Sequence, residues 1–276
     1  MNTLAIYHYF GFDLPMRERL ALIKSAGFDA VGLWRADYPG EPPHREYAEW
    51  ARAEGLLVID GHAPFSRVEN GEFSFSHLLW HDSLDADEVE KILTDTIVAA
   101  REDGVANLII HTTNPQVPPP NEVGAERVKR ITETAEKSGV VIALENMRRS
   151  QHLAYLFDRI DSPYLRFCYD SGHNNCFEPG VDVMSLFGDR LAAVHLHDND
   201  DSGDQHRIPF DGTVDWQTVM SKIAKSGYSG ATTLECEFSG GQEMPEEYLS
   251  KAYSAAKRLD TMRSAALDSG ERRKAQ

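Results

Sequence analysis

The 276-residue sequence has only three cysteines and no long apolar run. Cys168, Cys176 and Cys236 lack the close spacing of a structural metal site, and their odd number leaves no closed set of disulfides. We therefore expect reduced thiols and a cytoplasmic protein. No stretch reaches the roughly 18 consecutive apolar residues that span a bilayer, so we expect no membrane segment. The N-terminus, MNTLAIYHYFG, has no basic leader, which favours a first strand over a signal peptide.

Positive charge is also scarce, because 28 Lys and Arg stand against 44 Asp and Glu, giving a formal net charge of −16. A surface of this sign repels phosphate backbones and disfavours nucleic acid as a partner. The hydrophobic fraction of 41% is enough for a sizeable core and argues against disorder. The length is close to the roughly 250 residues typical of a (β/α)8 barrel.

One pattern recurs along the chain, in which a helix ends at a glycine and a short apolar run follows. The five segments are KSAGFDAVGLW (24–34), RAEGLLVIDG (52–61), REDGVANLIIH (101–111), EKSGVVIALEN (136–146) and AKSGYSGATTLE (224–235). Glycine after a helix readily adopts the left-handed conformation, and the apolar run is typical of a buried parallel strand. Three further runs have the same strand character and complete a set of eight: LAIYHY (4–9), LRFCYD (165–170) and LAAVHLH (191–197).

Segments with helical periodicity lie between these strands, over 15–27, 44–55, 87–104, 125–139, 214–227 and 244–266. Alternating strands and helices indicate an α/β protein with a parallel sheet, and eight units favour a (β/α)8 TIM barrel. The alternative is an open doubly wound sheet, but no G-x-G-x-x-G motif follows the first strand. We expect a single barrel domain over 1–266 and a frayed polar tail over 267–276.

Ionisable side chains stand at the carboxyl ends of six successive predicted strands, where the active sites of such barrels form. They are His62, His111, Glu145, Asp170 with His173, His195 and His197 with the following Asp204 and His206, and Glu235. Any one of them alone is more often an ordinary loop residue. Gathered at one mouth, they are costly to desolvate unless a cation compensates them. Imidazole and carboxylate ligands suit Mn²⁺, Zn²⁺, Co²⁺ or Fe²⁺ better than Ca²⁺, so the sequence predicts a divalent metal site.

The spacing within two of these strands bears on which residue binds the metal. Residues two apart on a strand face the same way, so His195 and His197 both point into the barrel. We expect His197, nearer the mouth, to bind the metal and His195 to orient a ligand. We expect Glu235 rather than Glu237 to bind it, because Glu237 falls in the following loop.

With these residues in place, the sequence resembles the xylose-isomerase-like TIM barrel superfamily over nearly its whole length. The most specific matches are ALEN, YDSGHNN, HLHDND followed by DQHRIPFDGTVDW, and GYSG followed by LE. The resemblance implies a sugar or sugar-phosphate isomerase or epimerase that forms dimers or tetramers. It also implies one Mn²⁺-like ion held by Glu145, Asp170, His197 and Glu235. The superfamily includes the endonuclease-four type apurinic-site nucleases, whose additional zinc ligands match His62, His111, His173, Asp204 and His206.

On the favoured interpretation, the chain acts on a small carbohydrate by proton transfer. One or more ions of Mn²⁺ or Zn²⁺, with Co²⁺, Mg²⁺ and Fe²⁺ as alternatives, would stabilise the enediolate formed when a C–H proton next to a carbonyl leaves. Glu145 and Glu235 would exchange that proton. The residues predicted to contact substrate are His173, Arg207, Trp34, His8 and Phe65. An ordinary loop salt bridge is the preferred alternative for Arg207, and core packing is at least as good an interpretation of the aromatic residues.

Three other functions remain open at this stage. A multi-zinc phosphodiesterase resembling an apurinic-site endonuclease accounts for the extra ligands but fits the negative charge poorly. A keto-sugar or cyclitol dehydratase could expel a hydroxyl from the same enediolate. A non-catalytic carbohydrate-binding barrel is disfavoured by the intact pair Glu145 and Glu235. Long loops over 62–85, 112–122 and 198–214 are predicted at the catalytic face, where such loops often act as lids.

Overall fold

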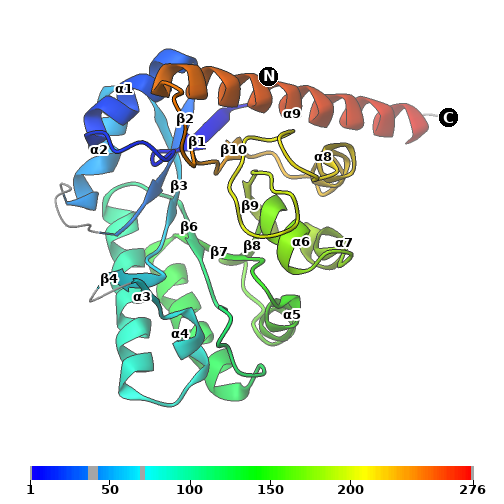
Figure 1. Ribbon diagram of the computed structural model, residues 1–276. Coiled ribbons are helices and arrows are strands. Elements are labelled where there is room, and N and C mark those ends of the chain that lie inside the picture. The colour runs from blue at the N-terminus through cyan, green and yellow to red at the C-terminus, as the bar shows by residue number, and fades with distance from the viewer. Residues whose placement is uncertain (1, 37–42, 69–71, 275–276) are drawn as a thin grey trace.

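The computed structural model describes residues 2–36, 43–68 and 72–274 and shows a parallel barrel (Figure 1). Its strands are β1 (Leu4–Tyr7), β2 (Ala30–Trp34), β3 (Leu57–His62), β6 (Asn107–Ile110), β7 (Val141–Glu145), β8 (Leu165–Asp170), β9 (Leu191–His195) and β10 (Thr232–Leu234). These eight strands are hydrogen-bonded in the order β10-β1-β2-β3-β6-β7-β8-β9. A parallel bridge between Leu196 and Leu234 joins the two ends of that order. The predicted TIM barrel is confirmed.

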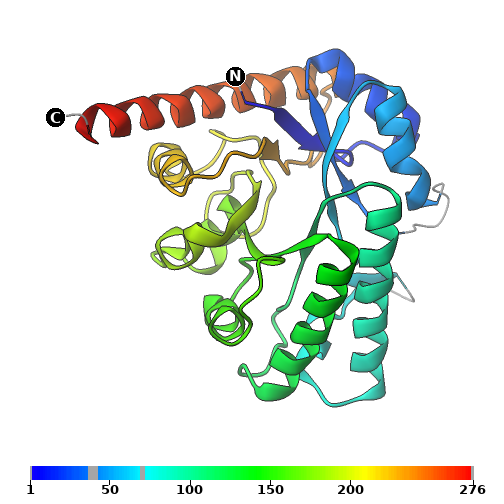
Figure 2. The same ribbon diagram turned by 180° about the vertical axis from the view of Figure 1, so that it is seen from behind.

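Helices surround the sheet, and the longer ones alternate with the strands along the chain (Figures 1 and 2). They are α1 (Met16–Ala26), α2 (Tyr47–Ala53), α3 (Leu84–Glu102), α4 (Glu122–Ser138), α5 (Ser150–Arg159), α6 (Ser171–Phe177), α7 (Val183–Phe187), α8 (Trp216–Lys225) and α9 (Pro245–Lys274), with short 3-10 helices at His44–Glu46, Ser76–Trp80 and Gly188–Arg190. Among the described helices, none has the length and apolar character needed to cross a membrane.

The glycines of the repeated pattern have the backbone conformation that the pattern predicts. Gly27, Gly55, Gly104, Gly139 and Gly227 have φ angles of 106°, 75°, 69°, 67° and 78°. Each lies in the left-handed region, where a side chain would be strained. The glycines therefore end the helices and turn the chain back toward the next strand, which sets the βα repeat.

The barrel interior is lined by small side chains beneath the ionisable ones. Ala143, Cys168 and Ala193 form a buried cluster, and each lies two residues before an ionisable residue on its strand. Because side chains alternate between the two faces of a strand, Glu145, Asp170 and His195 point into the same interior. The large apolar residues pack instead between the sheet and the helices. This arrangement leaves room inside the barrel for polar groups.

Several elements differ from the predicted ones. The sequence analysis did not predict α5, α6 and α7, and the loop predicted over 62–85 contains a hairpin of β4 (Ser66–Val68) and β5 (Glu72–Ser74). α6 begins with the polar run SGHNN and α7 has only 5 residues, so neither shows an apolar helical period. α5 has 10 residues, as many as the predicted α8, and its periodicity was overlooked. The last helix is longer than expected, since α9 continues to Lys274 through the range predicted as a frayed tail and extends past the barrel (Figure 1). That stretch is rich in Glu, Arg and Lys, which favour helix.

Candidate metal centre

The ionisable residues predicted at the strand ends come together at one end of the barrel in three groups, of which the first two share Glu145. Cys168 also lies within reach of Glu145 and His195. The first group is His62, His111 and Glu145, the second is Glu145, Asp170, His195 and Glu235, and the third is His173, His197, Asp204 and His206. In each group, one ligand atom per residue lies within 4.8 Å of every other. The convergence predicted from the sequence is therefore present in the structure.

The first group brings two imidazoles to one carboxylate oxygen. The Nε2 atoms of His62 and His111 lie 3.1 Å apart, and Glu145 Oε2 lies 3.4 Å from the former and 2.9 Å from the latter. His62 ends β3, His111 follows β6, and Glu145 ends β7, so three adjacent strands supply the group. A pair of nitrogens this close, facing one oxygen, needs a shared proton or cation between them.

The second group places two carboxylates on one nitrogen deep in the barrel. His195 Nδ1 lies 3.0 Å from Glu235 Oε2 and 3.3 Å from Glu145 Oε1. Both glutamates and His195 are almost fully buried, with exposed fractions of 1%, 3% and 0% for Glu145, Glu235 and His195. Burial raises the pKa of Glu235, but the charge of His195, its hydrogen bond and the charge of His206 together outweigh burial and lower that pKa to about 2. Glu235 is therefore held as a carboxylate.

The third group lies around Asp204 in the loop after β9. His173 Nε2 is 3.1 Å from Asp204 Oδ2, while His206 Nε2 and His197 Nε2 are 3.4 and 3.7 Å from Oδ1. The rings of His197 and His206 stack at 4.0 Å between centroids. Burial lowers the pKa of His173, but the charge of Asp170 and the hydrogen bond to Asp204 raise it well above its ordinary value. The acidic groups of this region thus favour positive charge.

The donor set fits a bound cation. Glu145 Oε1, His173 Nδ1 and His195 Nδ1 are buried without a hydrogen bond of acceptable angle, although the two nitrogens lie 3.1 and 3.3 Å from that oxygen. Buried polar atoms that are left without partners are costly, and an ion coordinated by all three would remove that cost. Mixed imidazole and carboxylate donors are suited to Zn²⁺ and Mn²⁺.

His195, which ends β9, and His197, just after it, fall into different groups. His197 is the residue predicted to hold the ion with Glu145, Asp170 and Glu235, and His195 is predicted to support it. Among the described residues, His195 belongs to that group and His197 to the third group. His197 still reaches the second group, because its Nε2 lies 3.0 Å from Asp170 Oδ1. Both histidines point into the barrel, as strand alternation predicts, but the carboxylates of the second group lie at the depth of His195.

Asp198 organises the loop that carries Asp204 and His206, and the sequence analysis did not identify it. Its Oδ1 accepts hydrogen bonds from the backbone of Asn199 and Val214 at 3.0 and 3.1 Å. Its Oδ2 accepts from the Phe210 backbone at 2.9 Å and from Trp216 Nε1 at 2.8 Å. The motif HLHDND…DW contains both the acceptor and the indole donor, but only the folded loop joins them.

We expect Asp198→Asn to lower the free energy of unfolding by about 2–4 kcal/mol, because the amide nitrogen cannot accept two of these bonds and leaves buried donors unsatisfied. Denaturant unfolding measures the change. The matched control is Asp200→Asn in the same loop, which weakens an exposed ion pair with Arg207 and is expected to change stability far less than Asp198→Asn. Equal stability of Asp198→Asn and the parent protein would contradict this role.

The residues predicted to contact substrate are distributed over different places. The Trp34 ring lies 4.2 Å from that of His62, and the Phe65 ring lies 4.6 Å from that of His111, so both aromatic residues line the first group. Arg207 instead forms an ion pair with Asp200 at 2.7 Å within its own loop, the alternative preferred for it. His173 lies between the second and third groups.

His8, which was predicted to contact substrate, lies on the outer side of the barrel wall, beside Tyr47 of α2. It is 4% exposed, its Nδ1 accepts a hydrogen bond from the Trp34 backbone at 3.3 Å, and its ring lies 5.4 Å from that of Tyr47 at the start of α2. The preceding Tyr7 points into the barrel, so strand alternation turns His8 toward the helices. Burial and the charge of Arg19 lower the pKa of His8 to about 3.

This shift predicts an acid-dependent loss of stability. The folded-state pKa of His8 lies below the ordinary value of about 6.5, so neutral His8 contributes fully to the free energy of unfolding above pH 6.5. As the pH falls from 6.5 toward 3, the unfolded state takes up the proton first, and this stability is lost at up to about 1.4 kcal/mol per pH unit. We expect the free energy of unfolding of His8→Gln to depend less steeply on pH over that window. Denaturant unfolding of both proteins at several pH values tests this, and identical slopes would exclude a contribution of His8.

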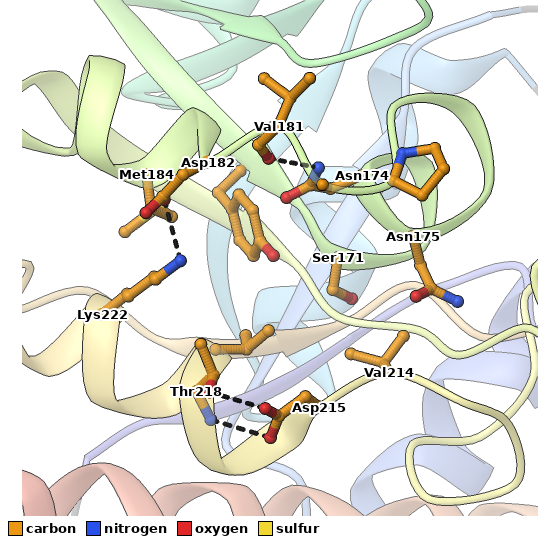
Figure 3. Close-up of a pocket in the computed structure, with 14 residues that line it drawn as sticks. Ser171, Asn174, Asn175, Val181, Asp182, Met184, Val214, Asp215, Thr218 and Lys222 are labelled. Atoms are coloured by element: carbon orange, nitrogen blue, oxygen red, sulfur yellow. Dashed lines mark hydrogen bonds and ion pairs between the residues drawn. The ribbon is translucent and has the colours of Figure 1, made fainter.

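A separate cavity of about 280 Å³ lies beside β8, between α6, α7 and α8 (Figure 3). Ser171 and Asn174 line one side, and the ion pair of Asp182 and Lys222, at 2.9 Å, lies at its edge. Tyr169 also lines it, on the face of β8 opposite to Asp170. The lining includes none of the residues of the three groups, so we assign the chemistry to the barrel mouth.

Comparisons with known proteins agree with this architecture. Residues 20–259 match the family model described as xylose isomerase-like TIM barrel. The chain is 28% identical over 294 residues to the uncharacterized protein y4fM of Sinorhizobium fredii (strain NBRC 101917 / NGR234), covering 95% of this chain and 94% of that protein. It is 22% identical over 241 residues to the fructoselysine 3-epimerase of Shigella flexneri, covering 80% and 85% of the two chains.

Solved structures show the same fold. An L-ribulose 3-epimerase superposes with a TM-score of 0.76 at 19% identity, covering 98% of this chain and 97% of that one. A xylose isomerase-like TIM barrel/4-hydroxyphenylpyruvate dioxygenase fusion protein superposes with a TM-score of 0.80 at 16% identity. That match covers 98% of this chain but 45% of the fusion protein, so the chain spans less than half of it. The chain therefore belongs to the xylose isomerase-like TIM barrel family.

Proposed function

We propose that the chain is a divalent-metal-dependent isomerase or epimerase of a sugar or sugar phosphate, which moves a proton at a carbon next to a carbonyl. The observation that carries the proposal is the pair of buried carboxylates, Glu145 and Glu235, that face one nitrogen of His195 from different strands at 3.3 and 3.0 Å. Two bases held this close can both reach one substrate carbon. A single general base typically contributes about 10²–10⁴-fold to such a proton transfer.

The relatives support the same class of substrate. The fructoselysine 3-epimerase matches 80% of this chain, and an L-ribulose 3-epimerase shares its fold over 98% of it. Fold likeness alone does not identify a reaction. The likeness supports the proposal because it agrees with the two carboxylates, Glu145 and Glu235, that face His195.

In the proposed reaction, some residues of this chain transfer the proton and others position the substrate. One of Glu145 and Glu235 removes the proton, and the other, or the same one, returns it. Return to the opposite face of the carbon inverts its configuration, and return to the neighbouring carbon interconverts ketose and aldose. Trp34 and Phe65 line the first group, where their rings can stack on the apolar face of a sugar.

The cation would be held by the second group, with further ions in the first and third groups. When bound, it supplies Lewis-acid stabilisation of the negative charge that develops on the substrate oxygen. The carboxylate–imidazole contacts within the groups fix the orientation of the ligands. Mn²⁺ and Zn²⁺ are the ions best suited to these donors.

Solvent-hydrogen exchange tests the proposed function. Protein loaded with Mn²⁺ or Zn²⁺ is incubated in D₂O with a panel of ketoses and ketose phosphates, and carbon-bound deuterium is measured by NMR or mass spectrometry. We expect deuterium at a carbon next to the carbonyl of at least one sugar. Exchange in none of them, with metal bound, would favour a non-catalytic carbohydrate-binding barrel. Accompanying loss of water would identify a dehydratase.

A second candidate, phosphodiester hydrolysis by a multi-metal centre, is favoured by the presence of the first and third groups beside the second. Two-metal and three-metal sites clamp the attacking and leaving oxygens of a phosphate. The net charge of −16 opposes binding of a nucleic acid. Nicking of an abasic DNA duplex at low salt separates the two functions, since strong cleavage without sugar exchange would replace the proposed isomerase by a hydrolase.

A further inference from the structure

A buried tyrosine and aspartate lie below the proposed metal centre, and the proposed reaction gives them no part. Tyr7 on β1 is 1% exposed, and Asp60 on β3 is 3% exposed. A carboxylate inside a barrel is costly to bury, and the described residues include no Lys or Arg paired with Asp60. Asp60 Oδ1 has no hydrogen-bond partner. Packing alone therefore does not explain why Tyr7 and Asp60 are buried together.

Strand register brings the two residues together. Tyr7 is paired with Gly32 on β2, and Gly32 is paired with Asp60 on β3, so the three residues form a row across three neighbouring strands. A Cβ on Gly32 would lie 2.6 Å from Tyr7 Cε2 and 2.8 Å from Asp60 Oδ1. Its φ lies outside the left-handed region, so the backbone does not require glycine. The missing side chain opens the gap through which Tyr7 reaches Asp60.

The tyrosine also contacts the histidine at the centre of the second group. Its hydroxyl lies 3.1 Å from His195 Nε2, with the rings nearly perpendicular at 5.0 Å between centroids. The same side chain lies against the carboxylate of Asp60 across Gly32, and its hydroxyl opposes the rise that burial causes in the pKa of Asp60. His195 Nδ1, on the other side of the ring, faces Glu235 and Glu145 at 3.0 and 3.3 Å.

The hydrogen-bonding chemistry of Tyr7, Asp60 and His195 fixes the direction of these hydrogen bonds. A carboxylate can only accept, so the Tyr7 hydroxyl donates its proton to Asp60. The Tyr7 oxygen is then left to accept the N–H of His195 Nε2. When a cation replaces the proton on Nδ1, the lone pair of Nδ1 is directed at the space between Glu145 and Glu235. Cys168 is another buried neighbour of His195, but a thiol is a weak hydrogen-bonding group and cannot impose this order.

We propose that Tyr7 and Asp60 are positioning residues, which hold His195 in the tautomer and orientation that present Nδ1 to a metal ion, and that Gly32 is required for them to meet. The inference rests on the metal-binding part of the proposed function. It assigns a role to an aspartate on β3 that touches neither ion nor substrate. Outer partners that orient a metal-binding histidine in this way typically contribute about 10–100-fold to metal affinity.

Metal affinity and the NMR signature of His195 test the proposal together. We expect Tyr7→Phe to weaken Mn²⁺ binding, measured by chelator competition, by about 10–100-fold. The matched control is Tyr169→Phe, another buried strand tyrosine that lines the outer cavity, which is expected to bind Mn²⁺ as the parent does. In zinc-loaded, ¹⁵N-histidine-labelled parent protein we expect His195 to carry its proton on Nε2.

Two further variants separate positioning from a structural role. Asp60→Asn keeps the shape but lets an amide donate to Tyr7, so the hydroxyl can donate to Nε2 and favour the wrong tautomer. We expect an altered His195 ¹⁵N pattern and the same loss of affinity, with melting retained. Gly32→Ala should reproduce that loss, because it separates Tyr7 from Asp60 without removing a polar group. If Tyr7→Phe binds Mn²⁺ with the affinity of the parent and leaves the His195 signature unchanged, Tyr7 and Asp60 do not position His195, although the metal centre stands. If the parent protein binds neither Mn²⁺ nor Zn²⁺, both the positioning role and the metal centre are overturned.

Discussion

Replacement of Glu145 with Gln is expected to lower the rate of carbon-bound hydrogen exchange by about 10²–10⁴-fold. Glutamine has the same shape but cannot take up a proton at neutral pH. Glu145 also belongs to both the first and the second group, with Oε2 at 2.9 Å from His111 and Oε1 at 3.3 Å from His195. The change therefore removes a base and one ligand at the same time, and it is the largest effect on catalysis that we expect from a single substitution.

The measurement separates these two consequences of Glu145→Gln. Exchange rates are determined at saturating Mn²⁺, with metal content and melting temperature measured on the same sample. Glu126→Gln is the matched control, because this glutamate is half exposed on α4 and is expected to leave exchange unchanged. Exchange within a few-fold of the parent rate, with the ion retained, would show that Glu145 does not transfer the proton.

We expect Asp170→Asn to lower Mn²⁺ affinity by at least the 10–100-fold that loss of an outer-shell partner typically costs. Asp170 is fully buried, and its Oδ1 lies 3.0 Å from His197 Nε2, so it connects the second and third groups. It also accepts the His173 backbone N–H at 2.6 Å at the start of α6. Asparagine keeps an acceptor for that bond, so the helix should remain formed.

Chelator competition and circular dichroism together check this expectation. The helical signal should match that of the parent while the dissociation constant for Mn²⁺ rises. A parent-like dissociation constant would mean that the ion is held without Asp170 and that the second group is not the principal site. A protein that fails to fold would instead show that the charge of Asp170 is needed for structure.

The fold could be predicted because its signals are local. Glycines such as Gly27 and Gly139 end helices by adopting positive φ, and each is followed by an apolar strand, so the βα unit can be recognised within about a dozen residues. The short helices α6 and α7 could not be recognised, because α6 begins with the polar run SGHNN and α7 has only 5 residues, so neither shows an apolar period. The end of α9 was misjudged because polar composition was interpreted as fraying.

The candidate site was predictable in composition but not in detail. Strand ends of a parallel barrel meet at one rim, which is why residues as distant as His62 and Glu235 could be expected together. The sequence favoured His197 over His195 because it lies nearer the mouth, but both point inward and only the depth of the carboxylates along the barrel separates them. Contacts that depend on strand order, such as Tyr7 with Asp60 across Gly32, are invisible until the register is known.

Metal analysis of the purified protein is the most direct test of whether separate βα units share a cation. The protein is loaded with Mn²⁺ or Zn²⁺, dialysed against metal-free buffer and analysed for metal per chain, and its melting is followed with and without chelator. We expect at least one ion per chain and a lower melting temperature after chelation, because the three groups then lose the charge that compensates them. Retention of neither ion, with melting unaffected by chelator, would contradict the metal centre and the function built on it.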